Sequence, residues 1–396
     1  MIVAGRFLAK ARLPWALACV LVSVVFEAQR YPSAPPPLPT LLLPVAERVL
    51  ETAAATAQSP RLAWASGGEI PAPAGAPSAH ASALVAGPQG ELRAYWWAGA
   101  HESAPDVAIY TARYTNGRWS AARRVLTREG LAAQLGFGVR RLGNPSVWRA
   151  PDGRLHLWVV ATGLGGWAAS RVVQLVSTDD ESFRALRVLP LTPLWNTSVL
   201  VRTPPVALVD GGWLLPAYFE LGTKYPLLVS FDAKGRPRSM RRIGRSTTSL
   251  QPSLLPLSAT ALRAWMRDHG AQARLQRALS LDGGQTWRDE PAPPIVNHDS
   301  SIATLRLHSG GCVMLHNDQA PAPATPRQWL RLSTSADGER WSAGPDVRLG
   351  APGDEFSYPA ALQIGNQLHV TYTLQRRSIG HSVFNLVPAG AREVVP

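Results

Sequence analysis

The sequence has little cysteine, few acidic residues and no zinc-ligand pattern. Only Cys19 and Cys312 are present, so once a leader containing Cys19 is set aside, no internal disulfide can form. The His298-Asp299 and His316-Asn317-Asp318 runs are isolated and do not have the spacing of metal ligands. No basic helix or aromatic-flanked basic motif occurs, which argues against nucleic acid as a partner. The sequence therefore predicts neither a metal site nor a cofactor.

The shortage of acidic residues leaves a strong positive charge. Forty lysines and arginines face 27 aspartates and glutamates, for a formal net charge of +13. An acidic glycan, a phosphate-rich surface or another polyanion would suit such a charge. The basic residues are nearly all arginines and are spread over the whole chain, and this is better explained by general use of arginine on the surface.

Aromatic and turn-forming residues are abundant. The 396 residues include 14 tryptophans, 33 glycines and 35 prolines, which favours many short strands joined by tight turns. All-β domains of this kind run long as single units, so the length does not require two domains. We expect an all-β class.

The first part of the chain has the layout of a leader. Arg6, Lys10 and Arg12 precede an apolar run over residues 13–26, so residues 1–28 are predicted to be a signal peptide or a signal anchor. The run is shorter than the roughly 20 residues that span a bilayer. The expected location is periplasmic or secreted, with anchoring in the inner membrane by residues 13–26 as the alternative.

A proline-rich linker follows the leader. Residues 29–60 contain five prolines between positions 32 and 39, and residues 41–58 have the apolar spacing of a short amphipathic helix. The remaining residues, 61–396, are predicted to form the folded domain.

One octapeptide, Ser-Leu-Asp-Gly-Gly-Gln-Thr-Trp at residues 280–287, combines a hairpin turn with residues that stabilise it. The serine and aspartate side chains can hold backbone N–H groups, and two glycines permit positive φ. Degraded copies surround Asp179, Asp232 and Asp337, and a related turn ends at Trp119. Their spacing gives a period of about 50 to 60 residues, which suits a four-stranded propeller blade and predicts about six blades.

The octapeptide resembles the Asp-box of bacterial sialidase-like (BNR-repeat) proteins, and other segments resemble the same family. The resemblance covers about residues 80–385 and implies a six-bladed β-propeller of the sialidase type, in which the Asp-box has a structural role away from the active site. The segments are Tyr-Trp-Trp-Ala-Gly at 95–99, Gly-Asn-Pro at 143–145, Val-Arg-Thr-Pro-Pro at 201–205, Leu-Pro-Ala-Tyr-Phe-Glu at 215–220 and the stretch around Ser-Tyr-Pro at 357–359.

The resemblance also implies a set of catalytic residues. In sialidases a tyrosine paired with a glutamate is the nucleophile, which makes Tyr358 the candidate nucleophile and Glu220 its candidate base. This pairing predicts hydrogen-bond contact between their side chains. The acid/base is expected in the loop after residues 92–97, where Asp106 is preferred over Glu102.

Three arginines of sialidases bind the substrate carboxylate, and two have counterparts here. Arg267 and Arg327 match by position, whereas His80 stands where the first arginine would be, which puts sialic acid itself in doubt. Arg202, in the family-like segment at 201–205, and Asp299, in the polar loop at 297–301, are further expected substrate-binding residues.

Two functions follow from the resemblance. The first is a sialidase-like exo-glycosidase acting on an acidic oligosaccharide or polysaccharide through the tyrosine and glutamate pair. The alternative is a non-catalytic, carbohydrate-binding propeller involved in assembly of an envelope or capsular polysaccharide. The absent first arginine favours the second, and the retained Tyr358, Glu220, Arg267 and Arg327 favour the first.

Overall fold

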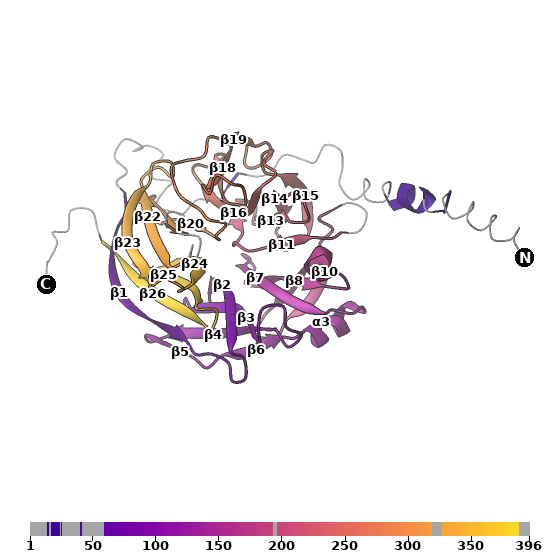
Figure 1. The fold of residues 1–396 in the computed structure, drawn as a ribbon, viewed down its shortest axis with the longest axis horizontal. Coiled ribbons are helices and arrows are strands. Elements are labelled where there is room, and N and C mark those ends of the chain that lie inside the picture. The colour runs from indigo at the N-terminus through magenta and orange to yellow at the C-terminus, as the bar shows by residue number, and fades with distance from the viewer. Residues whose placement is uncertain are drawn as a thin grey trace, which may run out of the picture.

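Strands are the main secondary structure of the described chain and form six separate sheets around a central axis (Figure 1). The computed structural model describes residues 14–15, 17–23, 25, 40–41, 59–192, 196–318 and 327–387. Each sheet has four or five strands, and each is one blade of a propeller. The prediction of a six-bladed, all-β propeller is therefore confirmed.

The blades follow one another along the chain. Blade 1 contains β2 (Ser78–Ala86), β3 (Leu92–Gly99), β4 (Ala108–Thr115), β5 (Arg118–Trp119) and β6 (Arg123–Leu126); blade 2 contains β7 (Arg141–Arg149), β8 (Leu155–Thr162), β9 (Ser170–Ser177) and β10 (Arg184–Val188). Blade 3 contains β11 (Val199–Val201), β12 (Val206–Ala207), β13 (Trp213–Phe219), β14 (Tyr225–Phe231) and β15 (Pro237–Arg242); blade 4 contains β16 (Ser249–Pro256), β17 (Leu262–Asp268), β18 (Gln276–Ser280) and β19 (Arg288–Glu290). Blade 5 contains β20 (Ala303–Arg306), β21 (Cys312–Asn317), β22 (Trp329–Ser335) and β23 (Ser342–Leu349); blade 6 contains β24 (Phe356–Ile364), β25 (Gln367–Leu374), β26 (Ser378–Val387) and β1 (Arg61–Ile70).

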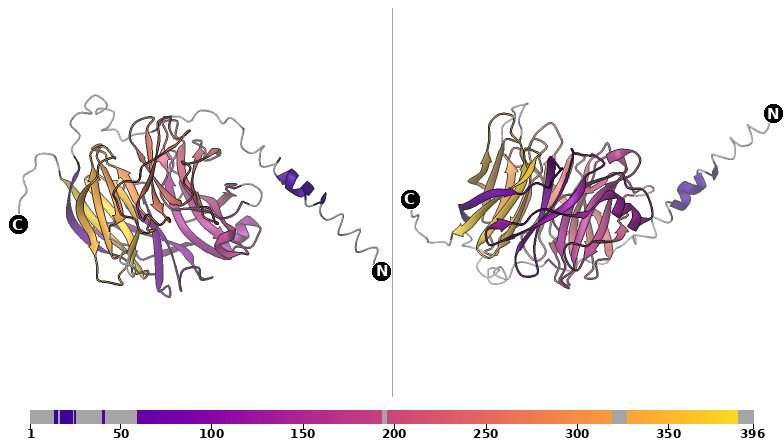
Figure 2. Two further views of the ribbon diagram at one scale, coloured as in Figure 1. Left: turned by 45° about the horizontal axis from the view of Figure 1, so that its top comes forward. Right: turned by 90° about the horizontal axis from the view of Figure 1, so that it is seen from below.

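The last blade joins the two ends of the domain. The first strand, β1, pairs antiparallel with β26, from Arg61 opposite Val387 to Ile70 opposite Ile379. The side views show this long strand along the outside of the yellow blade (Figure 2). Because the ring is closed by main-chain hydrogen bonds, blades 6 and 1 are held together at the point where the ring starts and ends.

The core is divided among the interfaces between blades. Six apolar clusters are buried, one between each pair of neighbouring blades. Tryptophans provide much of the volume: Trp96, Trp158, Trp213 and Trp265 are among the largest fully buried side chains. Aromatic residues in alternating strand positions therefore attach each blade to the next, as expected from their high content in the sequence.

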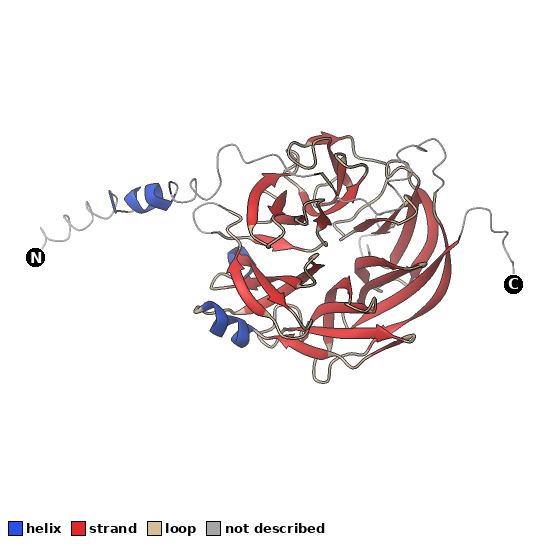
Figure 3. Cartoon of the chain, turned by 180° about the vertical axis from the view of Figure 1, so that it is seen from behind, coloured by secondary structure: helices blue, strands red, loops and turns tan. Residues whose placement is uncertain are grey.

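Short helices lie outside the sheets. Helix α3 (Arg128–Leu135) lies at the outer edge of the propeller, and the 3-10 helix η1 (Gly166–Ala169) connects β8 to β9 (Figure 3). The Thr127 hydroxyl caps α3 by accepting a hydrogen bond from the Gly130 N–H. Only η1 borders the cavity described below.

The Asp-box has the local structure that its residues predict. The Asp282 carboxylate accepts hydrogen bonds from the N–H groups of Gln285 and Thr286, and the Ser280 hydroxyl accepts one from the Gly284 N–H. Gly284 has a φ of 97°, and a Cβ added there would lie 2.7 Å from a methyl carbon of Leu228. The turn therefore requires glycine for both its backbone conformation and its close packing.

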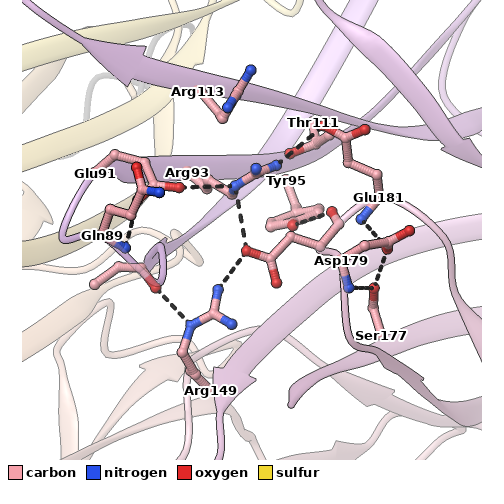
Figure 4. Close-up of polar contacts among 12 residues, drawn as sticks. Gln89, Glu91, Arg93, Tyr95, Thr111, Arg113, Arg149, Ser177, Asp179 and Glu181 are labelled. Carbon is pink, nitrogen blue, oxygen red and sulfur yellow. Dashed lines mark hydrogen bonds and ion pairs between the residues drawn. The ribbon is translucent and has the colours of Figure 1, made fainter. Parts of the chain in front are cut away.

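The degraded box of blade 2 takes part in a buried ionic network with blade 1 (Figure 4). A carboxylate oxygen of Asp180 lies 2.6 Å from Arg149 Nη2 and 3.4 Å from Arg93 Nε. The Tyr95 hydroxyl donates to the Asp180 carbonyl oxygen at 2.7 Å. Arg93 also lies 3.5 Å from Glu91, so charged groups of two blades compensate each other inside the interface.

Two expectations concern the region before the propeller. Leu41, where the amphipathic helix was expected to begin, instead forms an isolated β-bridge with Leu208 and is buried, and residues 42–58 lie outside the described residues. The described residues of the leader, within 14–25, are helical. No helix in the described part of the chain is long and apolar enough to cross a membrane. The roles assigned to residues 1–28 stay predictions.

Candidate active site

The first strands of several blades are interrupted near the axis. The pairing register shifts between His80 and Ala83 in β2, between Leu142 and Pro145 in β7, between Leu250 and Ser253 in β16 and between Ser357 and Ala360 in β24. In three of these bulges a residue other than glycine has a positive φ: 58° at Ala81, 49° at Gln251 and 51° at Tyr358. Such bulges turn a side chain away from the strand's normal alternation and concentrate at functional sites.

The bulged strands surround a cavity of about 480 Å³ at the axis. Every blade contributes at least one lining residue from a strand or from a connection next to one, and blade 5 contributes Arg327, which lies just before β22. The lining residues are Glu102, Asn144, Trp167, Ala168, Ser198, Leu200, Tyr218, Glu220, Leu221, Lys224, Gln251, Arg267, Arg327, Tyr358 and Arg376. The residues of the Asp-box are not among them, which agrees with a structural role.

Tyr358 has donor groups at its hydroxyl. Arg267 Nη1 donates to the Tyr358 oxygen at 3.2 Å, and Gln251 Nε2 donates at 3.5 Å. The guanidinium carbon of Arg327 lies 5.8 Å from the ring centroid. Burial opposes ionisation of the phenol, but Arg267, Arg327 and the two hydrogen bonds outweigh it, so the pKa of Tyr358 lies below its ordinary value.

Three arginines line the cavity, and carboxylates hold each of them. Arg267 Nε donates to Asp299 Oδ1 at 2.5 Å, and Arg327 Nη1 donates to Glu355 Oε1 at 3.0 Å. Burial opposes ionisation of both carboxylates, but their bonds to the cations keep the pKa of Asp299 and of Glu355 below the ordinary values. Rigid, charged guanidinium groups in one cavity can bind a carboxylate or a similar planar anion.

The third arginine, Arg376, was not predicted. It lies in the turn between β25 and β26 with a φ of 52°, and its Nε donates to Glu355 Oε2 at 2.8 Å. Its Nη1 donates to Glu102 Oε2 at 2.5 Å. No sequence motif distinguishes Arg376 from the neighbouring Arg377; only the closure of the ring brings blade 6 beside the loop of blade 1 that carries Glu102.

The expected acid/base residues differ in position. Glu102 lines the cavity and is paired with Arg376. Asp106 is exposed, does not line the cavity and accepts a hydrogen bond from the Ala100 N–H at 2.9 Å. The preference for Asp106 over Glu102 therefore has no support from the cavity geometry, because Asp106 stabilises the loop and does not face the cavity.

Glu220 faces the same cavity as Tyr358 but does not contact it as expected. Both residues line the cavity, yet no hydrogen bond joins the two side chains among the described residues. Burial raises the pKa of Glu220, and the nearby cations Arg267 and Lys224 oppose this only in part. Glu220 is therefore poised to carry a proton at a higher pH than an ordinary glutamate.

Three predicted substrate-binding residues lie behind the cavity wall. His80 is 2 % exposed, and its ring packs against that of Tyr358 with the two centroids 4.1 Å apart and the ring planes tilted by 52°. Arg202 is also 2 % exposed and donates to backbone carbonyl oxygens of Ser82, Tyr358 and Pro359. Asp299 holds Arg267 through its carboxylate and Arg327 through its carbonyl oxygen. None of the three lines the cavity, so the geometry gives them supporting positions and not direct contact with a ligand.

Burial decides the charge of His80. Burial lowers the pKa of the His80 imidazole well below its ordinary value. The surrounding arginines lower this pKa further, and Arg376 has the largest effect among them. A neutral imidazole cannot replace the charge of the first arginine of a clamp. Arg376, from blade 6, lines the cavity and adds a cationic side chain to its wall. Among the described residues, no group of three histidine, cysteine or acidic side chains could hold a metal ion.

Comparison with known proteins identifies a matching family model and related folds. The model of the BNR repeat-like domain family matches residues 90–370. No curated protein matches the chain in sequence.

Several solved structures share the fold. A Hadza microbial sialidase, Hz136, superposes with a TM-score of 0.64 at 14 % identity, over 79 % of this chain and 67 % of that one. A protein of unknown function from Dyadobacter fermentans gives a TM-score of 0.64 at 14 % identity over 82 % of this chain and 99 % of its own. The Trypanosoma rangeli sialidase gives a TM-score of 0.61 at 13 % identity, over 78 % of this chain and 55 % of its own. At these identities the likeness concerns the fold alone.

Proposed function

This chain belongs to the BNR repeat-like domain family, and on that premise we propose that it is a sialidase-like exo-glycosidase that removes an anionic sugar from an acidic glycan. The observation that carries the proposal is the placement of Tyr358, whose hydroxyl faces a cavity lined by Arg267, Arg327 and Arg376. A nucleophile beside a cluster of cations is suited to a sugar that carries its own negative charge next to the reacting carbon.

The cavity supports an anionic ligand by its charge. Lys224 joins the three arginines at the wall, and Glu102 and Glu220 are the only carboxylic residues among the lining residues. Because the arginines are already fixed by Asp299 and Glu355, they lose little freedom when an anion binds. The volume of about 480 Å³ is within the range of small-molecule sites and suits one terminal sugar.

The proposed reaction is a double displacement. Tyr358 first loses its phenol proton to solvent; its oxygen then forms a bond to the anomeric carbon while the bond from that carbon to the leaving-group oxygen breaks, and a carboxylic acid gives its proton to that oxygen. Water then attacks the same carbon, the resulting carboxylate takes a proton from the water, and the bond to Tyr358 breaks. Two inversions at the carbon give net retention.

Glu220 is the better candidate for the acid. Burial raises the pKa of Glu220, which keeps it protonated at higher pH, whereas the carboxyl group of Glu102 is already occupied by its hydrogen bond from Arg376. This differs from the sequence-based assignment, in which Glu220 was the base for Tyr358 and Asp106 or Glu102 was the acid. The reason is geometric: Glu220 faces the cavity without bonding to Tyr358.

A panel of fluorogenic glycosides, including sialosides and uronides, tests the proposal. We expect the wild type to release the fluorophore from at least one anionic glycoside and Tyr358→Phe to lose nearly all of that activity. Tyr225→Phe, a tyrosine outside the cavity, is the matched control and should keep it. Equal turnover by wild type and Tyr358→Phe would remove Tyr358 as nucleophile. Absence of turnover on every substrate, together with glycan binding, would instead support the non-catalytic carbohydrate-binding propeller.

A further inference from the structure

Arg202 is a buried cation that has no carboxylate partner among the described residues. It lies between β11 and β12, and its guanidinium group donates to Ser82 O at 3.0 Å, Tyr358 O at 2.6 Å and Pro359 O at 2.8 Å. Carbonyl oxygens stabilise a guanidinium group but do not neutralise it. A buried charge without a counter-ion is unfavourable, so a negative group nearby would be stabilised by Arg202.

The nearest group able to become negative is Tyr358. The guanidinium carbon of Arg202 lies 5.3 Å from the centroid of the Tyr358 ring. On the hydroxyl end, Arg267 Nη1 is 3.2 Å from the phenol oxygen. A guanidinium group can only donate hydrogen bonds, so the Tyr358 oxygen must accept this one, and acceptance favours the ionised phenol.

Apart from Glu220, the charged side chains around the cavity include two more cations than carboxylates. Five cationic side chains, Arg202, Arg267, Arg327, Arg376 and Lys224, surround or line it. Three carboxylates, Asp299, Glu355 and Glu102, pair with those arginines. Because burial raises the pKa of Glu220, its carboxyl group is disfavoured as a counter-ion, so an ionised Tyr358 can supply one of the two missing charges and an anionic substrate the other.

We propose that Arg202, Arg267 and Arg327 hold Tyr358 as a phenolate before substrate binds, so that the nucleophile is prepared by buried cations and not by proton transfer to Glu220. The proton of Tyr358 passes to solvent in the free protein, and the phenolate oxygen then forms the bond to the anomeric carbon. Arg202 is a positioning residue, because it acts on Tyr358 from behind and does not reach the cavity. The nucleophilic role rests on the function proposed above, whereas the charge of Tyr358 does not.

Every blade packed against Tyr358 presents a group that bears on its ionisation. His80, which packs against the Tyr358 ring, is held neutral by burial and adds no charge. The pKa of Tyr218 is raised by burial and by Glu220, so of the two phenols that contact Gln251, Tyr358 is the one that ionises first. The titratable or charged groups facing Tyr358 are His80 from β2, Arg202 beside β11, Tyr218 and Glu220 at β13, Arg267 from β17 and Arg327 before β22.

Ultraviolet difference titration of the full chain without substrate tests this proposal. The spectrum of Tyr358→Phe is subtracted from that of the wild type at each pH, which isolates the tyrosinate absorbance of Tyr358 from that of the other seven of the eight tyrosines. We expect this phenol to ionise at a lower pH than an ordinary tyrosine, whose pKa is near 10. Glu220→Gln should keep this signal, and Arg202→Met should move its midpoint upward by about one unit or more. Arg267→Lys provides a second variant if Arg202→Met does not fold.

The outcomes separate the two proposals. A difference spectrum with no tyrosinate below about pH 10, or its disappearance in Glu220→Gln, would overturn the phenolate proposal. A low-pH tyrosinate in a protein that cleaves no glycoside would support the phenolate and reject the hydrolase. An upward shift in Arg267→Lys, measured on protein with unchanged near-ultraviolet circular dichroism, would support activation by cations, and an unchanged midpoint would contradict it.

Discussion

Lowering the pH from 7 to 5 should destabilise the propeller through its buried histidines. His156, His316 and His369 are each at most 4 % exposed, and burial is the main cause that lowers the pKa of each to about 4. The folded state therefore binds fewer protons than the unfolded state in this range. The contribution of these neutral histidines to the free energy of unfolding is fully present above the unfolded pKa of about 6.5. It is lost as the pH falls from about 6.5 toward the folded pKa of about 4.

The size of the loss follows from the two pKa values. At pH 5 an unfolded histidine with a pKa of about 6.5 gains about 2 kcal/mol from protonation, and a folded one with a pKa near 4 gains almost nothing. Three such residues give about 6 kcal/mol. Since whole domains are stable by roughly 5–15 kcal/mol, this is a large part of the total.

Urea unfolding followed by tryptophan fluorescence at pH 7 and pH 5 measures the effect. His156→Gln should reduce the difference between the two pH values by about 2 kcal/mol, because His156 packs between Gln174 and Trp213 as a neutral ring. His308→Gln is the control, since His308 is exposed and its removal should leave the difference unchanged. Equal unfolding free energies at pH 7 and pH 5 in the wild type would refute the reasoning.

Three further predictions concern the cavity and the Asp-box. In a steady-state assay, Arg376→Ala should lower kcat/KM by roughly tenfold to a hundredfold, mainly through KM, because a charged hydrogen bond contributes about 1.5–3 kcal/mol. Arg377→Ala, at an exposed neighbouring residue, should change kcat/KM little in the same assay. Glu220→Gln should remove the fall in kcat/KM that the wild type shows as the pH rises through the raised pKa of Glu220, as measured by a pH–rate profile. Asp282→Ala should lower the unfolding free energy by about 2 kcal/mol, because its hydrogen bonds to the Gln285 and Thr286 N–H groups are lost. The same variant should leave kcat/KM unchanged. A loss of activity in folded protein would contradict the structural role of the Asp-box.

The blade architecture could be predicted because its signals are local. A serine, an aspartate and glycines within one turn, as at residues 280–287, stabilise that turn without help from distant residues. Strand-forming runs between such turns then recur with a fixed period, which gives the number of blades. Tyr358 could be named as a candidate for a similar reason, since it lies in a short motif at the start of a strand, and the structure places it at the cavity.

The rest of the site depends on bulges and ring closure, which leave no clear pattern in the sequence. Arg376 reaches the cavity only because β26 pairs with β1 and brings the turn before it beside Glu102. His80 and Arg202 were expected to bind substrate, but both contact Tyr358 from behind: His80 at the register shift of β2, and Arg202 in the connection between β11 and β12. With 40 lysines and arginines in the chain, residue type alone could not separate a cavity arginine from a surface one.

Mass spectrometry after reaction with an activated fluorinated anionic glycosyl donor tests the central claim most directly. Such a donor slows the second displacement more than the first, so a covalent glycosyl-enzyme accumulates. The account predicts a single added sugar on the peptide that contains Tyr358, and no adduct in Tyr358→Phe. Release of the leaving group by wild type with no adduct on Tyr358, or with the adduct on another residue, would contradict it.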